Sequence, residues 1–362
     1  MSEKKTVVVA LSGGVDSSTT AALLVERGHN VIGVMMRLWS EGAGDGDARF
    51  AQNRCCSPEA VADARGVCQN LGIPFYLLNF EAEFKMNVVD FFLDGYAHGI
   101  TPNPCLECNR RVKFGTLLDK ARALGADYLA TGHYARVVER AGKFLLLKGV
   151  DPKKDQSYAL SVLTQEQLAR VMFPLGEFTK AATRELARKF GLRVSEKSES
   201  QDLCFVADGD YRNFLRRNIP DSLNAGNIVD ARGKVLGRHA GLAFYTIGQR
   251  EGLRIAARQP LYVLALDSAR NAVVVGAKED LGKRELIARN VNWIQGAPPR
   301  EGARVTAMIR YRASTEECVV YSLAENRARV VFDSPLSAIA PGQAVVFYAG
   351  EECLGGGIIE SA

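Results

Sequence analysis

The feature that most constrains the fold is an apolar strand that runs through a small polar loop into a helix. Residues 6–11 form a continuous run of mostly β-branched residues, as expected of a strand buried on both faces. Residues 12–18 form the loop, and the helical pattern over 17–27 ends at Gly28. Strands that alternate with helices in this way predict a doubly wound parallel sheet.

The rest of the chain divides into three regions by the spacing of its apolar residues. Further strands are predicted over 31–36, 75–78 and 128–130, with helices over 59–71 and 112–124. After about residue 205 short strands and glycine turns predict a small, mostly-β, antiparallel central module, with strands over 234–237, 261–266 and 272–275. Strands over 305–311, 318–322, 328–332, 344–348 and 357–360 predict a C-terminal β-barrel. We therefore expect a catalytic α/β domain over 1–205, a central β-rich domain over 206–282 and a barrel over 283–362.

The loop after the first strand has the residues of a pyrophosphate site. Gly13 and Gly14 let the backbone approach a ligand, and Ser17 and Ser18 place hydroxyls at the positive end of a helix. The Gly-Lys-Ser/Thr end of a Walker loop is absent, so we expect ATP to be cleaved between its α and β phosphates, with Asp16 holding Mg²⁺. The alternative is a glycine turn with a serine cap, but the complete string between strand and helix favours phosphate binding.

Composition limits the compartment and the partners. The chain of 362 residues is 47% hydrophobic and 24% charged, and its net charge of +5 permits a polyanionic partner without requiring one. We expect no membrane span, because no apolar run approaches about 18 residues. The N-terminus resembles no secretory signal, so we expect a cytoplasmic protein. In a reducing compartment the eight cysteines are expected to be buried or functional thiols.

Two cysteine-containing strings are candidates for covalent chemistry. Cys108 lies in a proline-stiffened segment over 99–114, close to the expected start of a helix and to Arg110, Arg111 and Lys113, which favour a thiolate. Cys204 lies in the polar string 198–206, at the end of the α/β region. A single cysteine is more often an inert buried thiol, but two in polar loops beside a nucleotide site favour function.

The loop over 12–18 resembles that of the N-type ATP pyrophosphatases, the PP-loop superfamily, whose members adenylate a carbonyl oxygen. Further strings distinguish one family within this superfamily. They are 101–114, 130–134, 154–158, 200–205 and 241–252, and the last reads GLAFYTIGQREG. With them the chain resembles the bacterial tRNA-specific 2-thiouridylase family over nearly its whole length.

The resemblance implies a tRNA-uridine 2-sulfurtransferase. ATP would adenylate the C2 oxygen of the wobble uridine, and Cys204 would carry a persulfide received from an upstream sulfur donor. Cys108 would be the nucleophile, which either releases sulfide from that persulfide or forms a disulfide with Cys204. The resemblance places ATP against Ala10, Leu11, Ser12, Gly13, Gly14, Val15, Asp16, Ser17, Met36 and Gly132. It places tRNA or its target base against Asn103, Pro104, Cys105, His133, Lys154, Asp155, Gln156, Arg310, Tyr311 and Gln343.

The chain departs from the family at Cys105, where the best-known members carry aspartate. Cys105 and Cys108 have the CxxC spacing of a metal site, so a [4Fe–4S] cluster held by both and by Cys204 is an alternative carrier of sulfur. Zinc or a redox pair competes with that assignment. The remaining cysteines are assigned to structure: Cys55, Cys56, Cys68, Cys318 and Cys353.

Two other functions remain open from the sequence. Another PP-loop synthetase would need the phosphate loop but neither Cys108 nor Cys204. A non-catalytic tRNA-binding or sulfur-carrier protein would not need the phosphate loop. A basic stretch could contact a tRNA backbone or be a solvated face; its residues are Lys180, Arg184, Arg188, Lys189, Arg193 and Lys197.

Overall fold

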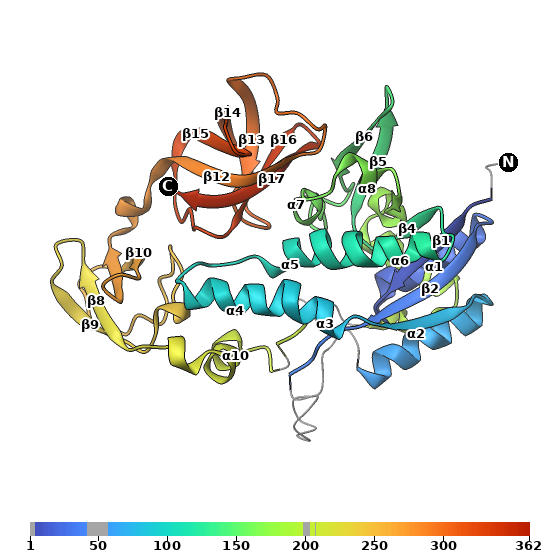
Figure 1. Cartoon of the computed structure of the whole chain (residues 1–362), viewed down its shortest axis with the longest axis horizontal. Helices are drawn as coiled ribbons and strands as arrows, with labels where there is room; N and C mark the ends of the chain where they lie inside the picture. Colours follow the sequence, from blue (N-terminus) through green and yellow to red (C-terminus); the bar gives the residue numbers. More distant parts are fainter. Residues whose placement is uncertain (1–3, 42–56, 198–202, 207) are drawn as a thin grey trace.

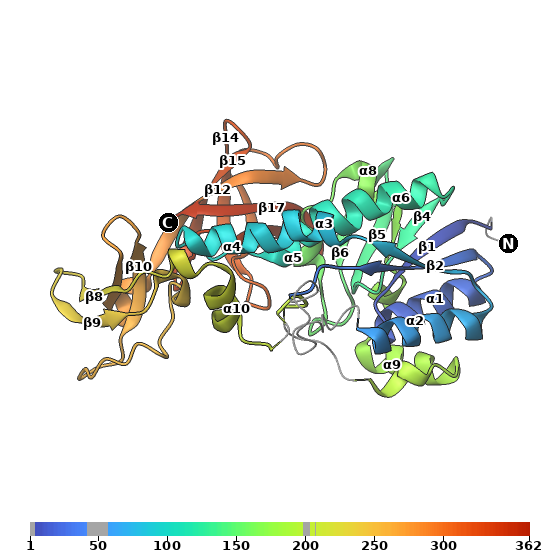
Figure 2. The ribbon, with the colours of Figure 1, turned by 60° about the horizontal axis from the view of Figure 1, so that its bottom comes forward.

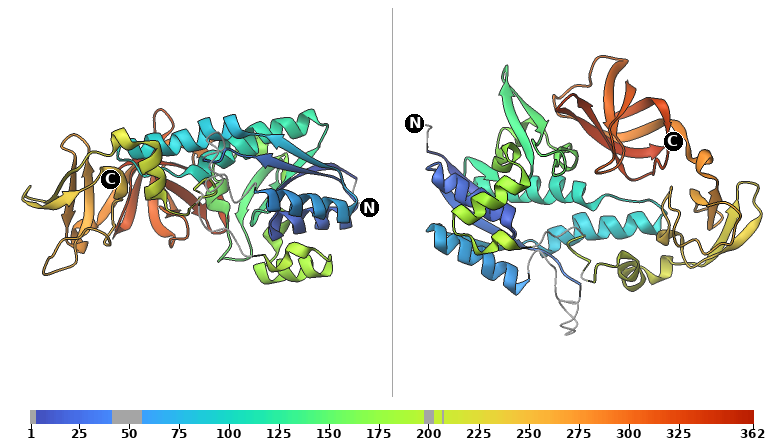
Figure 3. Two further views of the ribbon diagram at one scale, coloured as in Figure 1. Left: turned by 90° about the horizontal axis from the view of Figure 1, so that it is seen from below. Right: turned by 180° about the vertical axis from the view of Figure 1, so that it is seen from behind.

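The computed structural model describes residues 4–41, 57–197, 203–206 and 208–362 and contains three sheets (Figure 1). The α/β part and the central module lie at opposite ends of the molecule, with the barrel beside both (Figure 3). Cys55, Cys56 and residues 198–202 of the second cysteine string lie outside the described residues.

The first sheet is parallel throughout, which confirms the predicted fold class. Its five strands lie in the order β3-β2-β1-β4-β7. Their bounds are β1 Thr6–Leu11, β2 Asn30–Arg37, β3 Phe75–Asn79, β4 Tyr128–Ala130 and β7 Val171–Met172. The order reverses between β1 and β4, so the loops that follow these two strands meet at the switch point where ligands bind in such sheets.

Helices cover both faces of this sheet (Figure 2). Val7 and Val9 of β1 pack with helices α1 (Val15–Glu26) and α2 (Pro58–Leu71), whereas Val8 between them packs with the other face. Alternate side chains of one strand therefore join two cores, as a strand buried on both faces requires. Helix α9 (Lys180–Lys189) packs against α1.

Two interrupted helices cover the second face and reach toward the central module (Figures 1 and 2). The first runs through α3 (Glu81–Phe84), a π-helical turn (Lys85–Val89) and α4 (Asp90–Ala97). The second runs through α5 (Pro104–Glu107), a π-helical segment (Cys108–Leu117) and α6 (Leu118–Ala123). The predicted start at residue 112 was too late, because Asn103 caps the helix through its side chain and Pro104 occupies the first turn.

The central module is a mixed sheet in the order β10-β11-β8-β9. Its strands are β8 Gly226–Asp230, β9 Val235–His239, β10 Tyr262–Asp267 and β11 Ala272–Gly276. The prediction of an antiparallel module was wrong in one pairing, since β11 lies parallel to β8. Strand β8 was not predicted. The long connection over 240–261 lets β10 run in the same direction as β9, so that β11, which is antiparallel to β10, runs parallel to β8. Helix α10 (Tyr211–Asn218) joins this module to the first domain.

The C-terminal strands form a closed barrel. They are β12 Lys283–Trp293, β13 Ala303–Met308, β14 Glu316–Leu323, β15 Arg327–Leu336, β16 Ala344–Ala349 and β17 Glu352–Ser361, and β12 pairs with β17 to close the sheet. A hairpin from the first domain, β5 (Ala135–Arg140) and β6 (Lys143–Lys148), adds to β17 through Leu146 opposite Cys353. The barrel sheet therefore continues into the α/β part of the chain.

The remaining helices are short and lie in connections. They are α7 Ser157–Leu160, α8 Gln165–Leu168, and the 3₁₀ turns Pro174–Glu177, Arg193–Glu196, Pro220–Ser222, Leu242–Phe244 and Lys278–Leu281. In the described part of the chain, every helix is too short or too polar to cross a bilayer.

An aromatic cluster joins the long helices to the segment after residue 202. Phe92 of α4 is buried, and its ring lies 5.2 Å from that of Phe205 and 6.1 Å from that of Phe214 of α10. Phe205 also contacts Phe84, at 6.1 Å between ring centroids. These contacts hold α4, α10 and the second cysteine segment together.

We expect Phe92→Ala to lower the free energy of unfolding by about 3–5 kcal/mol, because it leaves a cavity among these rings. Its sequence neighbour Phe91 is 37% exposed, and Phe91→Ala is the matched control, with a loss below about 1 kcal/mol. Urea unfolding followed by tryptophan fluorescence measures both values. Equal losses would contradict the assignment of Phe92 to the cluster that joins these elements.

Candidate nucleotide and RNA site

The loop after β1 is closed by its own serine hydroxyls. Ser17 Oγ accepts from the backbone N–H of Ser12 at 3.1 Å, and Ser18 Oγ donates to the Gly14 carbonyl at 2.9 Å. Gly13 has φ of +68°, and a Cβ there would lie 2.9 Å from the Ala60 Cα of α2. Only glycine therefore fits at position 13, and the loop leads directly into the positive N-terminal end of α1, where an anion is stabilised.

Asp16 is the centre of the charged contacts in this loop. Lys180 Nζ lies 2.6 and 2.8 Å from its two carboxylate oxygens, and the Tyr134 hydroxyl donates to one of them at 2.8 Å. Gly132 follows β4, and a Cβ there would lie 2.9 Å from atoms of Asp16. The absence of a side chain at Gly132 lets the loops after β1 and β4 touch.

A second lysine contacts the same loop. Lys197 Nζ donates to the Gly13 carbonyl at 3.2 Å and forms an ion pair with Asp63 at 2.7 Å. Sequence reasoning assigned Lys180 and Lys197 only to a basic stretch. No local pattern distinguishes them from their neighbours, because their partners lie far away in the chain.

Other members of that stretch bind within their own region. Arg184 donates to the carbonyl of Ser195, and Arg188 pairs with Glu196 at 2.9 Å.

Met36 lies at the end of β2 and is partly buried against the large core cluster. Among the proposed ATP positions, Leu11 and Val15 are buried, and Ala10 is partly buried.

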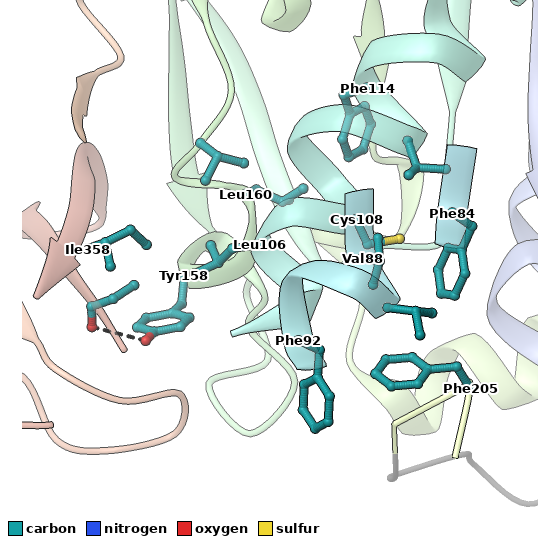
Figure 4. Close-up of a cluster of buried hydrophobic side chains, with 14 of the residues drawn as sticks. Phe84, Val88, Phe92, Leu106, Cys108, Phe114, Tyr158, Leu160, Phe205 and Ile358 are labelled. Atoms are coloured by element: carbon teal, nitrogen blue, oxygen red, sulfur yellow. Dashed lines mark hydrogen bonds between the residues drawn. The ribbon is translucent and has the colours of Figure 1, made fainter. Parts of the chain in front are cut away.

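Both proposed catalytic cysteines pack at one large hydrophobic cluster, and Figure 4 shows the part around Cys108. Cys108 begins the π-helical segment, is 8% exposed and packs among Phe84, Val88 and Phe114. Cys204 is half-buried against the same cluster, beside the anchored ring of Phe205. Two cysteine segments that are remote in the sequence therefore pack against the same hydrophobic cluster, where Phe205 contacts the ring of Phe84.

The cations near Cys108 are partly neutralised. Glu107 is buried, and its carboxylate pairs with Arg110 at 3.2 Å and with Arg111 at 3.4 Å. The predicted attraction of a thiolate by these arginines is weakened accordingly.

The alternative of an iron–sulfur cluster receives no support from the described residues. Cys105 is exposed, Cys108 is buried and Cys204 is half-buried. No group of three His, Cys, Asp or Glu side chains in the described ranges could hold a metal ion. The CxxC spacing suggested such a site, and the arrangement of the described side chains does not add to that suggestion.

A groove of about 500 Å³ separates the segment after β6 from the barrel. One wall carries Lys154 and Asp155, and the other carries Met308, Tyr311 and Arg312. Tyr158 lies at the base, 5.8 Å from the ring of Tyr311, and its hydroxyl donates to the Ala344 carbonyl at 3.1 Å. The groove therefore places two separate strings of proposed tRNA residues on facing walls.

Two more proposed tRNA residues adjoin the groove through Tyr158. The side chain of Asn103 hydrogen-bonds to Tyr158, and the charge of Arg310 acts on the same phenol. Burial nevertheless holds the pKa of Tyr158 well above its ordinary value. Sequence reasoning did not single out Tyr158 as a functional residue.

Three other proposed tRNA contacts are engaged inside the protein. Asp155 accepts from the N–H groups of Gly149 and Ser157, at 3.0 and 3.1 Å. Gln156 accepts from the backbone N–H of Tyr134 at 3.0 Å. Gln343 donates to the Thr101 carbonyl at 2.9 Å. These side chains shape the backbone around the groove.

His133 is 8% exposed and lies between two aromatic rings. Its ring lies 5.8 Å from that of Phe114 and 5.9 Å from that of Phe173, and Nδ1 is 2.6 Å from the Thr131 hydroxyl. Burial is the main cause that holds the pKa of His133 well below its ordinary value, and Lys113 adds to it. The imidazole is therefore neutral at physiological pH.

Comparisons with known proteins cover the whole length of the chain. Residues 5–208 match the tRNA methyl transferase HUP domain family, residues 212–277 the tRNA methyl transferase PRC-barrel domain family and residues 283–359 the aminomethyltransferase β-barrel domain family. The chain is 54% identical to a protein of Moorella thermoacetica named tRNA-specific 2-thiouridylase MnmA, over 98% of this chain and 99% of that protein. A protein of Geobacter metallireducens with the same name is also 54% identical, over 100% and 99%.

Among solved structures, a 4-thiouridine synthetase in complex with RNA and ATP aligns with a TM-score of 0.38 and 19% identity, over 60% of this chain and 51% of that one.

The buried His133 predicts a loss of stability in acid. A depressed pKa in the folded state means that the unfolded state binds more protons, so stability is complete above the unfolded value of about 6.5 and falls below it. We expect His133→Gln to reduce the difference in melting temperature between pH 7.5 and 5.5. His98 is exposed, and His98→Gln should leave that difference as in the wild type. An unchanged difference in His133→Gln would show that another group causes the acid loss.

Proposed function

The chain belongs to the tRNA-specific 2-thiouridylase family, and on that premise we propose that it uses ATP to replace the C2 oxygen of a tRNA uridine with sulfur. Cys108 and Cys204 at one hydrophobic cluster, in the same domain as a phosphate loop, are the observation that carries the proposal. A PP-loop synthetase without sulfur chemistry needs no such pair of thiols.

The first step activates the uridine. The C2 oxygen attacks the α phosphorus of ATP, the bond to the β-phosphate oxygen breaks, and pyrophosphate leaves from the loop over residues 12–18. Lys180 supplies near this loop the positive charge that a Walker loop carries in its own sequence. Asp16 would hold Mg²⁺, which neutralises phosphate charge when it is bound; one carboxylate suffices, because Mg²⁺ takes its other ligands from phosphate and water. The proposed contacts to ATP are Ala10, Leu11, Ser12, Gly13, Gly14, Val15, Asp16, Ser17, Met36 and Gly132.

The second step transfers sulfur from a persulfide on Cys204. An upstream donor protein would supply the outer sulfur atom. That sulfur bonds to C2 of the adenylated uridine, and AMP leaves with the C2 oxygen. Cys108 thiolate then attacks Cys204 Sγ, which breaks the S–S bond of the persulfide and leaves its outer sulfur on the base as the thiocarbonyl. The two cysteines become a disulfide as that sulfur is reduced, and an external thiol must return two electrons.

The groove between residues 152–158 and the barrel is the proposed binding site for tRNA. Lys154 and Arg312 supply charge for phosphate, and Tyr311 offers a ring for stacking. The Arg312 guanidinium lies 5.3 Å over that ring and extends the surface. The proposed contacts to tRNA are Asn103, Pro104, Cys105, His133, Lys154, Asp155, Gln156, Arg310, Tyr311 and Gln343. With the proposed division at residues 205 and 282, these contacts come from the first and third domains, and we expect the enzyme to work in the cytoplasm.

The proposal is tested by a complete reaction with unmodified tRNA, ATP and a persulfide donor. We expect 2-thiouridine in the nucleoside digest, with AMP and pyrophosphate formed in equal amounts. Pyrophosphate exchange that ignores tRNA and yields no thiouridine would favour a different synthetase. Binding of tRNA without either product would favour a carrier or binding protein.

We expect Lys180→Met to lower the rate of thiolation by at least about 100-fold while tRNA affinity stays within about threefold, because the lysine stabilises charge on the leaving phosphates. Lys189 lies on the same helix and pairs with Glu26, so Lys189→Met is the matched control. Single-turnover rates and filter binding measure the two quantities. A Lys180→Met enzyme that thiolates as fast as the Lys189→Met enzyme would rule out this role.

The three cysteines near the site should respond differently to replacement. Cys108→Ala and Cys204→Ala should each abolish multiple-turnover thiolation, because each removes one half of the proposed disulfide. Cys105 is exposed and is proposed to contact tRNA without a covalent part in these steps, so Cys105→Ala should still turn over repeatedly, within about threefold of the wild-type rate at saturating tRNA, while its tRNA affinity falls. Mass spectrometry of the digested tRNA is the measurement. Loss of activity in Cys105→Ala equal to that in Cys108→Ala would contradict the two-cysteine mechanism.

A further inference from the structure

Three domains meet at Thr101, two residues before the cap of the helix that carries Cys108. Its backbone N–H donates to the Pro341 carbonyl at 3.2 Å, and its carbonyl accepts from the Gln343 amide at 2.9 Å. Its hydroxyl donates to the Thr246 hydroxyl of the central module at 3.3 Å. The backbone and side chain of one residue thus bind both the barrel and the central module.

Two glycines allow these surfaces to approach so closely. Gly342 has φ of +90°, and a Cβ there would lie 2.8 Å from the Thr101 carbonyl oxygen and would collide with the Ile100 side chain. Gly248 has φ of +86°, and a Cβ there would collide with Ala338 of the barrel. Thr246 and Gly248 belong to the string over 241–252, which the sulfur chemistry above does not use. The string therefore supplies the central module's side of this three-domain contact around Thr101, the junction.

The junction is connected rigidly to Cys108. Pro102 follows Thr101 and packs against Gly95 of α4, where an added Cβ would lie 2.9 Å from its ring. Asn103 then accepts from the Leu106 N–H at 3.4 Å and caps α5. Cys108 follows within the next turn of the same continuous helix. A displacement at Thr101 must therefore move the start of the helix that carries this thiol.

The junction also borders the proposed tRNA groove. Gln343 directly precedes Ala344, whose carbonyl accepts from Tyr158 at the base of the groove. The groove has one wall on the barrel, so a ligand that fills it acts on the same part that holds Thr101.

We propose that Thr101 is a positioning residue through which the barrel and the central module set the place of Cys108, so that tRNA seated in the groove aligns this thiol for sulfur transfer. The inference rests on the proposed function. It assigns the 241–252 string to alignment of the catalytic helix rather than to chemistry.

The first test uses a pair of barrel glycines. Gly342→Ala drives a methyl group into residues 100 and 101. Gly296 has φ of +80° with no atom within 4 Å of an added Cβ, so Gly296→Ala imposes similar backbone strain without that collision. We expect Gly342→Ala to lower the single-turnover thiolation rate at saturating tRNA by about tenfold or more, with tRNA affinity within about threefold. Gly296→Ala should leave both within about twofold, although both variants lower the melting temperature.

The second test removes one hydroxyl. Thr246→Val deletes the hydrogen bond to Thr101 at nearly constant shape, and Thr246→Ser restores it. We expect Thr246→Val to lower the thiolation rate about threefold or more without a change in tRNA affinity, and Thr246→Ser to return to the wild-type rate.

The outcomes separate this inference from the function on which it rests. A wild-type enzyme that forms no 2-thiouridine would overturn the proposed function itself. If the wild type is active, the junction role is overturned when Gly342→Ala is no slower than Gly296→Ala, or when the loss lies in tRNA affinity alone. Failure of Thr246→Ser to restore the rate lost in Thr246→Val would likewise remove the hydroxyl contact from the proposal.

Discussion

The candidate site depends on one packing constraint, the burial of aromatic rings between α4, α10 and the segment that holds Cys204. Phe92 and Phe205 lie 5.2 Å apart, and both belong to the core cluster that contains Cys108. Burial of large aromatic side chains supplies the free energy that holds the cysteine segment against the long helices. This packing involves aromatic rings rather than sulfur, so it holds both cysteine segments in the fold without bonds to their thiols.

At the phosphate loop, the positive charge comes from lysines that lie far from the loop in the sequence. Asp16 lies between Lys180 of α9 and Tyr134 after β4, while Lys197 reaches the Gly13 carbonyl. Apart from Val15 and Asp16, the loop over 12–18 consists of glycines and serines, whose small side chains leave room for phosphate close to the backbone. Lys180 comes from α9 and Lys197 follows the 3₁₀ turn Arg193–Glu196; both elements pack on α1, and the positions of the two lysines depend on that packing.

The barrel is bound to the first domain in two ways that serve the groove. Hairpin β5–β6 extends the barrel sheet at β17, and the Lys148 ammonium lies 4.3 Å over the ring of Tyr348. On the other side, residues 341–343 hold Thr101. Strand pairing joins the barrel to the hairpin that precedes one wall of the groove, and the Thr101 contacts join the barrel to the segment before the helix of Cys108. In the proposed function, these contacts would link tRNA recognition to sulfur transfer.

The sequence by itself determined the local features: the bounds of β1 and β4, the phosphate loop and the candidate cysteines follow from period, glycine placement and side-chain chemistry within short windows. It also identified the barrel, but missed β12 and the hairpin β5–β6. The hairpin does have a local signal, since its strands are joined by the turn Ala141-Gly142, but its pairing with β17 depends on a segment about 200 residues away and leaves no local trace. Tertiary structure alone decided that Lys180 meets Asp16, that the segments of Cys108 and Cys204 pack against one hydrophobic cluster, and that Thr101 connects three domains. Each of these depends on how separate elements pack, and the free energy of packing is a sum over the whole molecule rather than a property of any one string.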